Sequence, residues 1–141
     1  MRINNYIPYI FILCGIFFLQ FIFGNSFCFS QEKQVAFIKF KKTKQNYGFA
    51  RQGEVIKFEY EFENTGAEPL IISDVKVSCG CTVAHFPKEP VLQGQKGIVL
   101  IMFDTKEKFD RQDRTVDVIS NATNSPIQLR FKCVVQYKKT E

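Results

Sequence analysis

The segment 54-EVIKFEYEF-62 decides the fold, because apolar and charged residues alternate along it from Ile56 to Phe62. Four apolar side chains share one face of the extended chain: Ile56, Phe58, Tyr60 and Phe62. Lysine and glutamate occupy the other face, which predicts a half-buried antiparallel strand covering a core. The strand is expected to stop at 63-ENTGAEP-69, where asparagine, glycine and proline favour a turn.

Similar short segments follow in both directions along the chain. We expect further strands at 34-QVAFIKF-40, 70-LIISDVKVS-78, 97-GIVLIMFD-104, 114-RTVDVIS-120 and 127-IQLRFKCVVQY-137. The apolar run 97–104 is consistent with a central strand, and the last segment places Cys133 and Tyr137 on its inward face. The charged segment 110-DRQDR-114 predicts a hairpin turn. Six or seven short strands without a helical period predict an all-β fold, an immunoglobulin-like antiparallel β-sandwich of about seven strands.

Residues 1–30 differ in composition from the rest of the chain. Arg2 is their only charged residue, and 6-YIPYIFILCGIFFLQFIFG-24 is apolar. A short basic start followed by an apolar stretch and small residues is typical of a secretory signal peptide, here cleaved after Ser30 to leave Gln31 first. An uncleaved hydrophobic anchor helix is the alternative, because about 18 apolar residues span a bilayer. Both interpretations place residues 31–141, a single sandwich domain, outside the cytoplasm: in the periplasm, at the cell surface or secreted.

Charge and motif content narrow the possible functions. The 141 residues carry a formal net charge of +5, which becomes +4 when Arg2 is removed with the signal. The lysines concentrate in 39-KFKKTK-44 and 136-QYKKTE-141, and we interpret them as solvated residues that protect sheet edges. An exported protein rarely meets nucleic acid. The sequence has no nucleophile elbow, phosphate-binding loop or metalloprotease motif, so neither an enzymatic reaction nor a cofactor is predicted.

Three cysteines and the single histidine outside residues 1–30 are the candidate functional residues: Cys79, Cys81, Cys133 and His85. Extending the alternation through 75-VKVSCGC-81 places Val75, Val77 and both cysteines of the Cys-Gly-Cys segment on the core side of one strand. Cys133 shares the inward face of the last strand. Buried packing, or a structural disulfide, is therefore one interpretation.

Two other interpretations of the Cys-Gly-Cys segment stay open. In a flat strand the Cα atoms of Cys79 and Cys81 would lie about 6.5–7 Å apart, so a bond between them requires a bend at Gly80 and would be a labile redox pair. Either cysteine could instead pair with Cys133. A Cu(I) or zinc site built on the two thiolates and His85 is the third interpretation, although structural zinc would need Cys133 as well. His85 is followed by two nearby prolines and is expected in a loop.

Residues 58–105 resemble the bacterial family known as domain of unknown function 1573. The shared motifs are 62-F-x-N-T-G-66, 69-PLII-72, 75-V-x-x-SCGCT-82 and 103-FDT-105, followed by Ser120-Asn121. Upstream, Asn46-Tyr47 stands where the family has an acidic residue and an aromatic one. The resemblance implies an exported protein with a sandwich similar to PapD-like and major-sperm-protein-like domains, and it implies no particular reaction.

These observations predict an exported, non-enzymatic module for protein interaction or assembly at the cell envelope. Its partner would be another envelope protein, and it would contact the membrane only if residues 1–30 are retained. Sandwiches of this kind bind partners by strand addition along an edge or through loops at one end. The alternative is a thiol-redox or copper- or zinc-binding periplasmic protein that uses the Cys-Gly-Cys segment.

Overall fold

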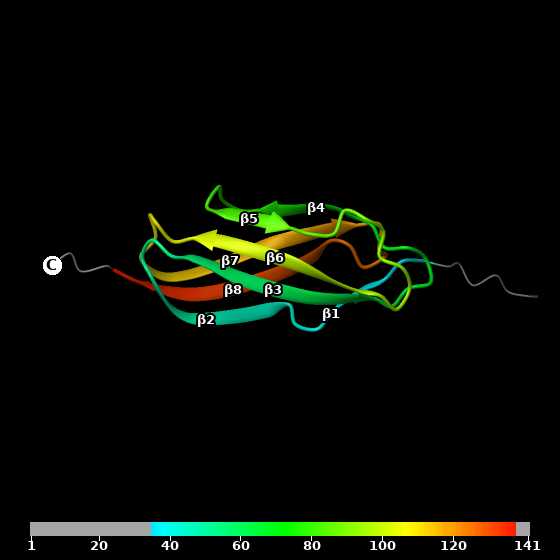
Figure 1. Ribbon diagram of the computed structural model, residues 1–141, viewed down its shortest axis with the longest axis horizontal. Coiled ribbons are helices and arrows are strands. Elements are labelled where there is room, and N and C mark those ends of the chain that lie inside the picture. Colours follow the sequence, from blue (N-terminus) through cyan, green and yellow to red (C-terminus); the bar gives the residue numbers. More distant parts are fainter. Residues whose placement is uncertain (1–34, 138–141) are drawn as a thin grey trace, which may run out of the picture. The chain divides into compact units, whose positions relative to one another are not determined.

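The computed structural model describes residues 35–137, which form two four-stranded sheets (Figure 1). The strands are β1 (Ile38–Phe40), β2 (Lys44–Arg51), β3 (Val55–Asn64), β4 (Ile72–Val77), β5 (Thr82–His85), β6 (Lys96–Asp104), β7 (Asp110–Ser120) and β8 (Ile127–Gln136). None of the described residues belongs to a helix that could cross a membrane. The predicted signal peptide or anchor at 1–30 lies outside the described residues.

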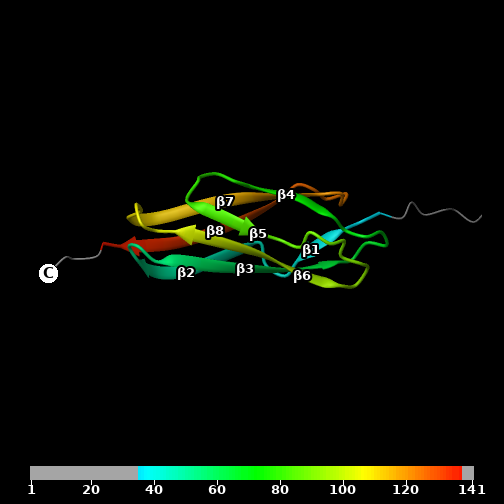
Figure 2. The ribbon, with the colours of Figure 1, turned by 45° about the horizontal axis from the view of Figure 1, so that its top comes forward.

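The strand order is that of an immunoglobulin-like sandwich. Sheet A has the order β1-β3-β6-β5 and sheet B the order β2-β8-β7-β4. These orders match the two sheets of immunoglobulin domains. The first strand of that fold corresponds here to two short strands, β1 in sheet A and β2 in sheet B. β1 pairs antiparallel with β3, and β2 then pairs parallel with β8 in the other sheet. The predicted all-β sandwich is confirmed, with eight strands in the described part of the chain where about seven were expected. Figure 2 shows β7 and β8 running side by side, with β3 below them.

The core lies between the two sheets and follows the alternation of the strands. In β3 the four predicted inward residues are all buried, and in β8 the inward residues from Leu129 to Val135 are buried as well. The Phe131 ring of sheet B lies 4.6 Å from the Phe58 ring and 5.3 Å from the Phe103 ring of sheet A, between centroids. The Tyr60 hydroxyl donates to the Arg130 carbonyl at 2.9 Å, a second link between the sheets. Burial raises the pKa of Tyr60.

Two predictions about the strands are wrong, and one strand was not predicted. The segment 110-DRQDR-114 is not a turn but the first half of β7, paired with β8 from Val135 to Phe131. Its inward positions carry Gln112 and Arg114, so the apolar alternation that marks a strand is missing there. β2 was not predicted because it is an edge strand with few buried residues and an irregularity near Gly48. His85, expected in a loop, is instead the last residue of β5, a strand of four residues that pair with β6.

Two strand ends also differ from expectation. Within the strand expected at 34–40, of which residues 35–40 are described, Ile38–Phe40 form β1. Tyr137 does not continue the inward face of β8, because β8 ends at Gln136 and the tyrosine side chain is 73% exposed.

The turn after β3 is organised by the buried side chain of Asn64. Its amide nitrogen donates to the carbonyl oxygens of Glu68 (2.8 Å) and Val91 (2.9 Å), and its amide oxygen accepts from the Gly66 N–H (3.0 Å). A Cβ atom at Gly66 would lie 2.3 Å from the Val35 carbonyl oxygen, so only glycine fits there. The Asn-Thr-Gly motif is therefore a structural element that joins the turn to two other backbone segments.

We predict that Asn64→Ala lowers the free energy of unfolding by about 3 kcal/mol, because three hydrogen bonds between its side chain and the backbone are lost. Urea denaturation followed by circular dichroism measures this change. The neighbouring Thr65→Ala, at an exposed position, is the control and should change stability by less than about 0.5 kcal/mol. Equal effects of the two substitutions would contradict the assigned role of Asn64.

Candidate functional site

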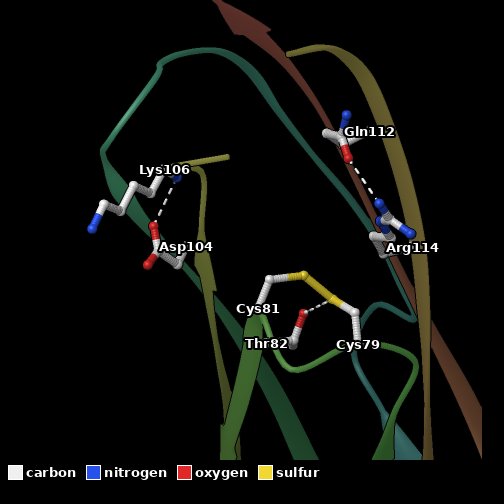
Figure 3. The surroundings of a disulfide bond; sticks show 7 residues. All are labelled: Cys79, Cys81, Thr82, Asp104, Lys106, Gln112 and Arg114. Atoms are coloured by element: carbon white, nitrogen blue, oxygen red, sulfur yellow. Dashed lines mark hydrogen bonds between the residues drawn. A yellow bond between two sulfur atoms is a disulfide. The ribbon is translucent and has the colours of Figure 1, made fainter. Parts of the chain in front are cut away.

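The candidate site lies where the chain passes from β4 in sheet B to β5 in sheet A (Figure 3). Here Cys79 and Cys81 form a disulfide, with their Cα atoms 5.3 Å apart. This distance is shorter than in a flat strand because the chain turns at Gly80. Gly80 is exposed, and a Cβ atom at this position would have no other atom within 4 Å. The sequence left three pairings open, and the structure has the one within the Cys-Gly-Cys segment.

The predicted register through 75–81 is wrong beyond β4. The strand ends at Val77, which pairs with Val116 of β7 and lies on the same, core-facing side of the sheet. Because it lies at the edge of the sheet, its side chain is nevertheless 37% exposed. The two cysteines belong to the turn, and both are half-buried against the margin of the core. The inward residue of this region is Thr82, which is 4% exposed and paired with Phe103.

Thr82 is a site residue that the sequence analysis missed. Its hydroxyl oxygen lies 3.4 Å from Sγ of Cys79, and its backbone N–H donates to the Cys79 carbonyl at 3.2 Å. The signal was present as the final residue of the Ser-Cys-Gly-Cys-Thr motif, three positions after Cys79. It was not recognised because the motif was read as a continuing strand, in which residues three apart do not meet.

A surface pocket of about 360 Å³ opens beside the disulfide. It is lined by residues 79–81 together with Asp104, Lys106, Glu107 and Lys108. The two lysines and two carboxylates balance in charge, so the pocket has no net sign. Figure 3 shows the Lys106 side chain extending away from the disulfide, while its backbone N–H donates to the Asp104 carboxylate at 2.8 Å. Small polar or charged molecules therefore have access to the disulfide.

Two further polar side chains lie on the inner face of β7, on the other side of the disulfide (Figure 3). The Arg114 guanidinium donates to the Gln112 side-chain oxygen at 3.0 Å, and the Gln112 amide donates to the Phe109 carbonyl at 2.8 Å. Nε of Arg114 is buried and has no hydrogen-bond partner within residues 35–137. These residues were hidden from the sequence analysis because 110–114 was assigned to a turn.

The other two candidate residues do not join the disulfide. Cys133 is a free, buried thiol on the inner face of β8. Burial raises the pKa of the Cys133 thiol, and the nearby charge of Arg114 offsets part of this effect. His85 was expected in a loop, but it is the last residue of β5, exposed and paired in register with Leu100.

The Cu(I) or zinc interpretation would require the reduced form of the pair. Metal ions bind the thiolate form of cysteine, and both sulfur atoms are engaged in the disulfide. Within residues 35–137, no three histidine, cysteine, aspartate or glutamate side chains come together in a potential metal site. His85 in particular is not grouped there with the two cysteines.

The disulfide closes a loop of only three residues, which limits its contribution to stability. Chain-entropy arguments give about 1.6 kcal/mol at 25 °C for such a loop, against about 4.7 kcal/mol for a loop of 100 residues. The bond therefore fixes the local turn between β4 and β5 and adds little to the cohesion of the two sheets.

We predict that the Cys79→Ser/Cys81→Ser variant keeps the fold and loses at most about 1.6 kcal/mol of unfolding free energy. Urea denaturation of the oxidised protein, the reduced protein and the variant separates the effect of the cross-link from that of the serines. A loss above about 3 kcal/mol on reduction alone would show that the bond holds the sheets together.

Solved structures with a similar fold show the class of protein, and a sequence profile shows the family. A protein of unknown function from Porphyromonas gingivalis W83 is similar with a TM-score of 0.64 at 20% identity, over 72% of this chain and 47% of that one. The PapD-like domain 7 of human CEP192 matches with a TM-score of 0.52 at 14% identity, over 76% and 89%. The VesB protease of Vibrio cholerae matches at 0.55 and 11% identity, over 70% and 31%.

At these identities the similar structures establish the fold alone. The described residues therefore have an immunoglobulin-like β-sandwich fold, which the PapD-like domain of CEP192 shares. The profile of the family described as Protein of unknown function (DUF1573) matches residues 38–135, and the chain belongs to this family. The resemblance seen in the sequence is thereby confirmed. The chain spans less than half of the Porphyromonas protein, and no curated protein matches it.

Proposed function

We propose that this protein is an exported, non-enzymatic module that assembles with a second copy of itself at the cell envelope. The observation that supports the proposal is an apolar row on the outer face of sheet A. The row consists of Ile98, Leu100 and Met102 on β6 and Val83 on β5, and we call it the outer apolar row. Ile98 is 46% exposed and Val83 is 50% exposed, whereas an outward sheet face is normally polar.

The sheet edges are less suited to binding than this face. β1 has three residues and β5 has four, which leaves few backbone groups for an added strand. β2 and β4 are each interrupted by a register shift, a feature that hinders pairing with another chain. We therefore favour docking through the face of sheet A over the strand addition expected from the sequence.

The charges at the two ends of the row favour a second copy as the partner. The outward residues of β6 run from Lys96 through the three apolar residues to Asp104. If a second copy stacks on this face with its β6 antiparallel and Leu100 at the two-fold axis, each Lys96 meets the partner's Asp104. Ile98 then meets Met102, so the same surface is complementary to itself, as a two-fold interface requires.

A charge exchange tests this arrangement. We predict that Lys96→Glu or Asp104→Lys weakens self-association about tenfold or more, because like charges then face each other at both ends of the interface. The double variant Lys96→Glu/Asp104→Lys should restore the dimer, since opposite charges meet again. Sedimentation equilibrium of the protein purified after expression of the full chain measures the dissociation constant.

The control for the charge exchange is Lys76→Glu, the same change at an exposed position of β4 in sheet B, which should leave self-association unchanged. A wild-type protein that stays monomeric would contradict self-assembly. A photo-reactive residue at Leu100 that links to a different, identified envelope protein would assign the outer apolar row to that protein instead.

Export is supported by the composition of residues 1–30 and has its own test. We predict that the protein recovered from cells expressing the full chain begins at Gln31 and has a mass two hydrogens below that of its reduced form, because it contains one disulfide. Intact-mass measurement before and after reduction gives both results. Recovery of the whole chain from the membrane fraction would instead indicate the anchor.

A second candidate function is thiol chemistry, which the accessible Cys79–Cys81 disulfide favours. In its redox form, the pair exchanges electrons with other thiols outside the cytoplasm. In its metal-binding form, the reduced pair binds Cu(I) or zinc, and an optical or mass titration of the reduced protein tests this directly. Neither form requires the outer apolar row.

A further inference from the structure

The two sulfur atoms of the disulfide have different surroundings. The Thr82 hydroxyl contacts Sγ of Cys79 at 3.4 Å (Figure 3). A disulfide sulfur carries no hydrogen, so the hydroxyl is the donor in this contact. Within residues 35–137, no donor makes an equivalent contact with Sγ of Cys81. The Cys79 sulfur alone therefore has a hydrogen bond ready to stabilise negative charge.

We infer that the disulfide is a thiol–disulfide exchange site in which an incoming thiolate attacks Sγ of Cys81 and Cys79 is the leaving group. The inference rests on the second candidate function above and is independent of self-assembly. A thiol leaves faster when its pKa is lower, and a hydrogen bond to the thiolate form lowers that pKa. The Thr82 hydroxyl supplies such a bond to Cys79, so Thr82 acts as a positioning residue that selects the direction of cleavage.

The exchange partner is a dithiol of another exported protein. One of its sulfur atoms, as a thiolate, bonds to Sγ of Cys81, the bond between the two protein sulfurs breaks, and Cys79 leaves as a thiolate. The second thiolate of the partner then attacks the partner's own sulfur in the mixed disulfide and releases Cys81. Each released thiolate takes a proton from water, the partner is oxidised to a disulfide, and this protein gains two electrons.

The disulfide is accessible from solvent, whereas Thr82 is fixed in position by the core and by its backbone partners. Gly80 is exposed, a Cβ atom there would meet nothing within 4 Å, and the adjoining pocket is open to solvent. Thr82 is buried, paired with Phe103 and bonded through its N–H to the Cys79 carbonyl, so its hydroxyl is in place before the reaction. The charges of the pocket balance and favour neither sulfur, whereas the Thr82 hydroxyl contacts Sγ of Cys79 alone among the described residues.

Cys133 does not compete in the exchange. It is a buried thiol on β8, and burial raises its pKa, so little of it is in the reactive thiolate form. Within residues 35–137 the exchange is therefore confined to the Cys-Gly-Cys turn. A maleimide should label Cys133 only after unfolding.

Reduction kinetics of the oxidised full chain test the inference, with dithiothreitol as the probe. Samples are quenched with a maleimide, and their masses report the fraction reduced. We expect the rate constant to fall about three- to tenfold in Thr82→Val, which removes the hydroxyl but keeps the shape, because the leaving thiolate loses one hydrogen bond. Thr82→Ser is the matched control and should react at the wild-type rate. Circular dichroism verifies that both variants are folded.

Two further measurements examine the direction of attack. With glutathione in place of dithiothreitol, peptide mass spectrometry should find the glutathione on Cys81 and the maleimide on Cys79. In the reduced protein, the pH profile of alkylation should give Cys79 the lower pKa, and this pKa should rise in Thr82→Val but not in Thr82→Ser.

The possible failures are distinguishable. If the disulfide of the folded protein resists dithiothreitol, both the redox function and this inference are wrong. If it is reduced but glutathione labels Cys79, or if Thr82→Val reacts at the wild-type rate, the redox function stands and the assigned roles of Cys81 and Thr82 are overturned.

Discussion

The packing of the Phe131 ring against Phe58 and Phe103 is the interaction on which the rest of the structure depends. These rings join the central strands of the two sheets, and the apolar residues around them become buried only if both sheets are present. The chain must therefore move repeatedly between sheets, and each crossing needs a turn with special chemistry. Asn64 and Gly66 provide it between β3 and β4, and the disulfide turn provides it between β4 and β5. The recognisable motifs of the family lie at these crossings, where ordinary alternation cannot continue.

The sequence predicted the strands that bury one full face and missed the others for identifiable reasons. β3 and β8 alternate regularly because their inward residues pack in the core, and β6 is marked by a continuous apolar run. The first half of β7 places Gln112 and Arg114 inward, and β2 and β5 are edge strands with few inward positions, so hydrophobic periodicity is weak in all three. The apolar run of β6 predicted a central strand, but the run alone does not indicate that one of its faces is exposed.

The candidate site was only half predictable. Composition identified the Cys-Gly-Cys segment, because two cysteines one residue apart are unusual in a small exported domain. The pairing was undecidable because it depends on whether the chain stays extended or turns at Gly80, and glycine permits both. Once the chain turns, Thr82 comes within reach of Cys79, although a continuous strand would separate them. The role of Thr82 follows from the crossing between sheets, which no local pattern reveals.

The two proposed sites share β5, and this constrains how each must be tested. Cys81 directly precedes the strand and Thr82 begins it, while Val83 belongs to the outer apolar row. β5 is held to sheet A by four paired residues and by the Asp104 N–H, which donates to the Cys81 carbonyl at 2.9 Å, so the turn that the disulfide fixes also limits the position of Val83. A measurement of self-association that does not control the thiol state would average over oxidised and reduced molecules, in which Val83 of the outer apolar row is held differently. Comparing fully oxidised protein with the Cys79→Ser/Cys81→Ser variant at equal concentration separates the contribution of the face from that of the turn.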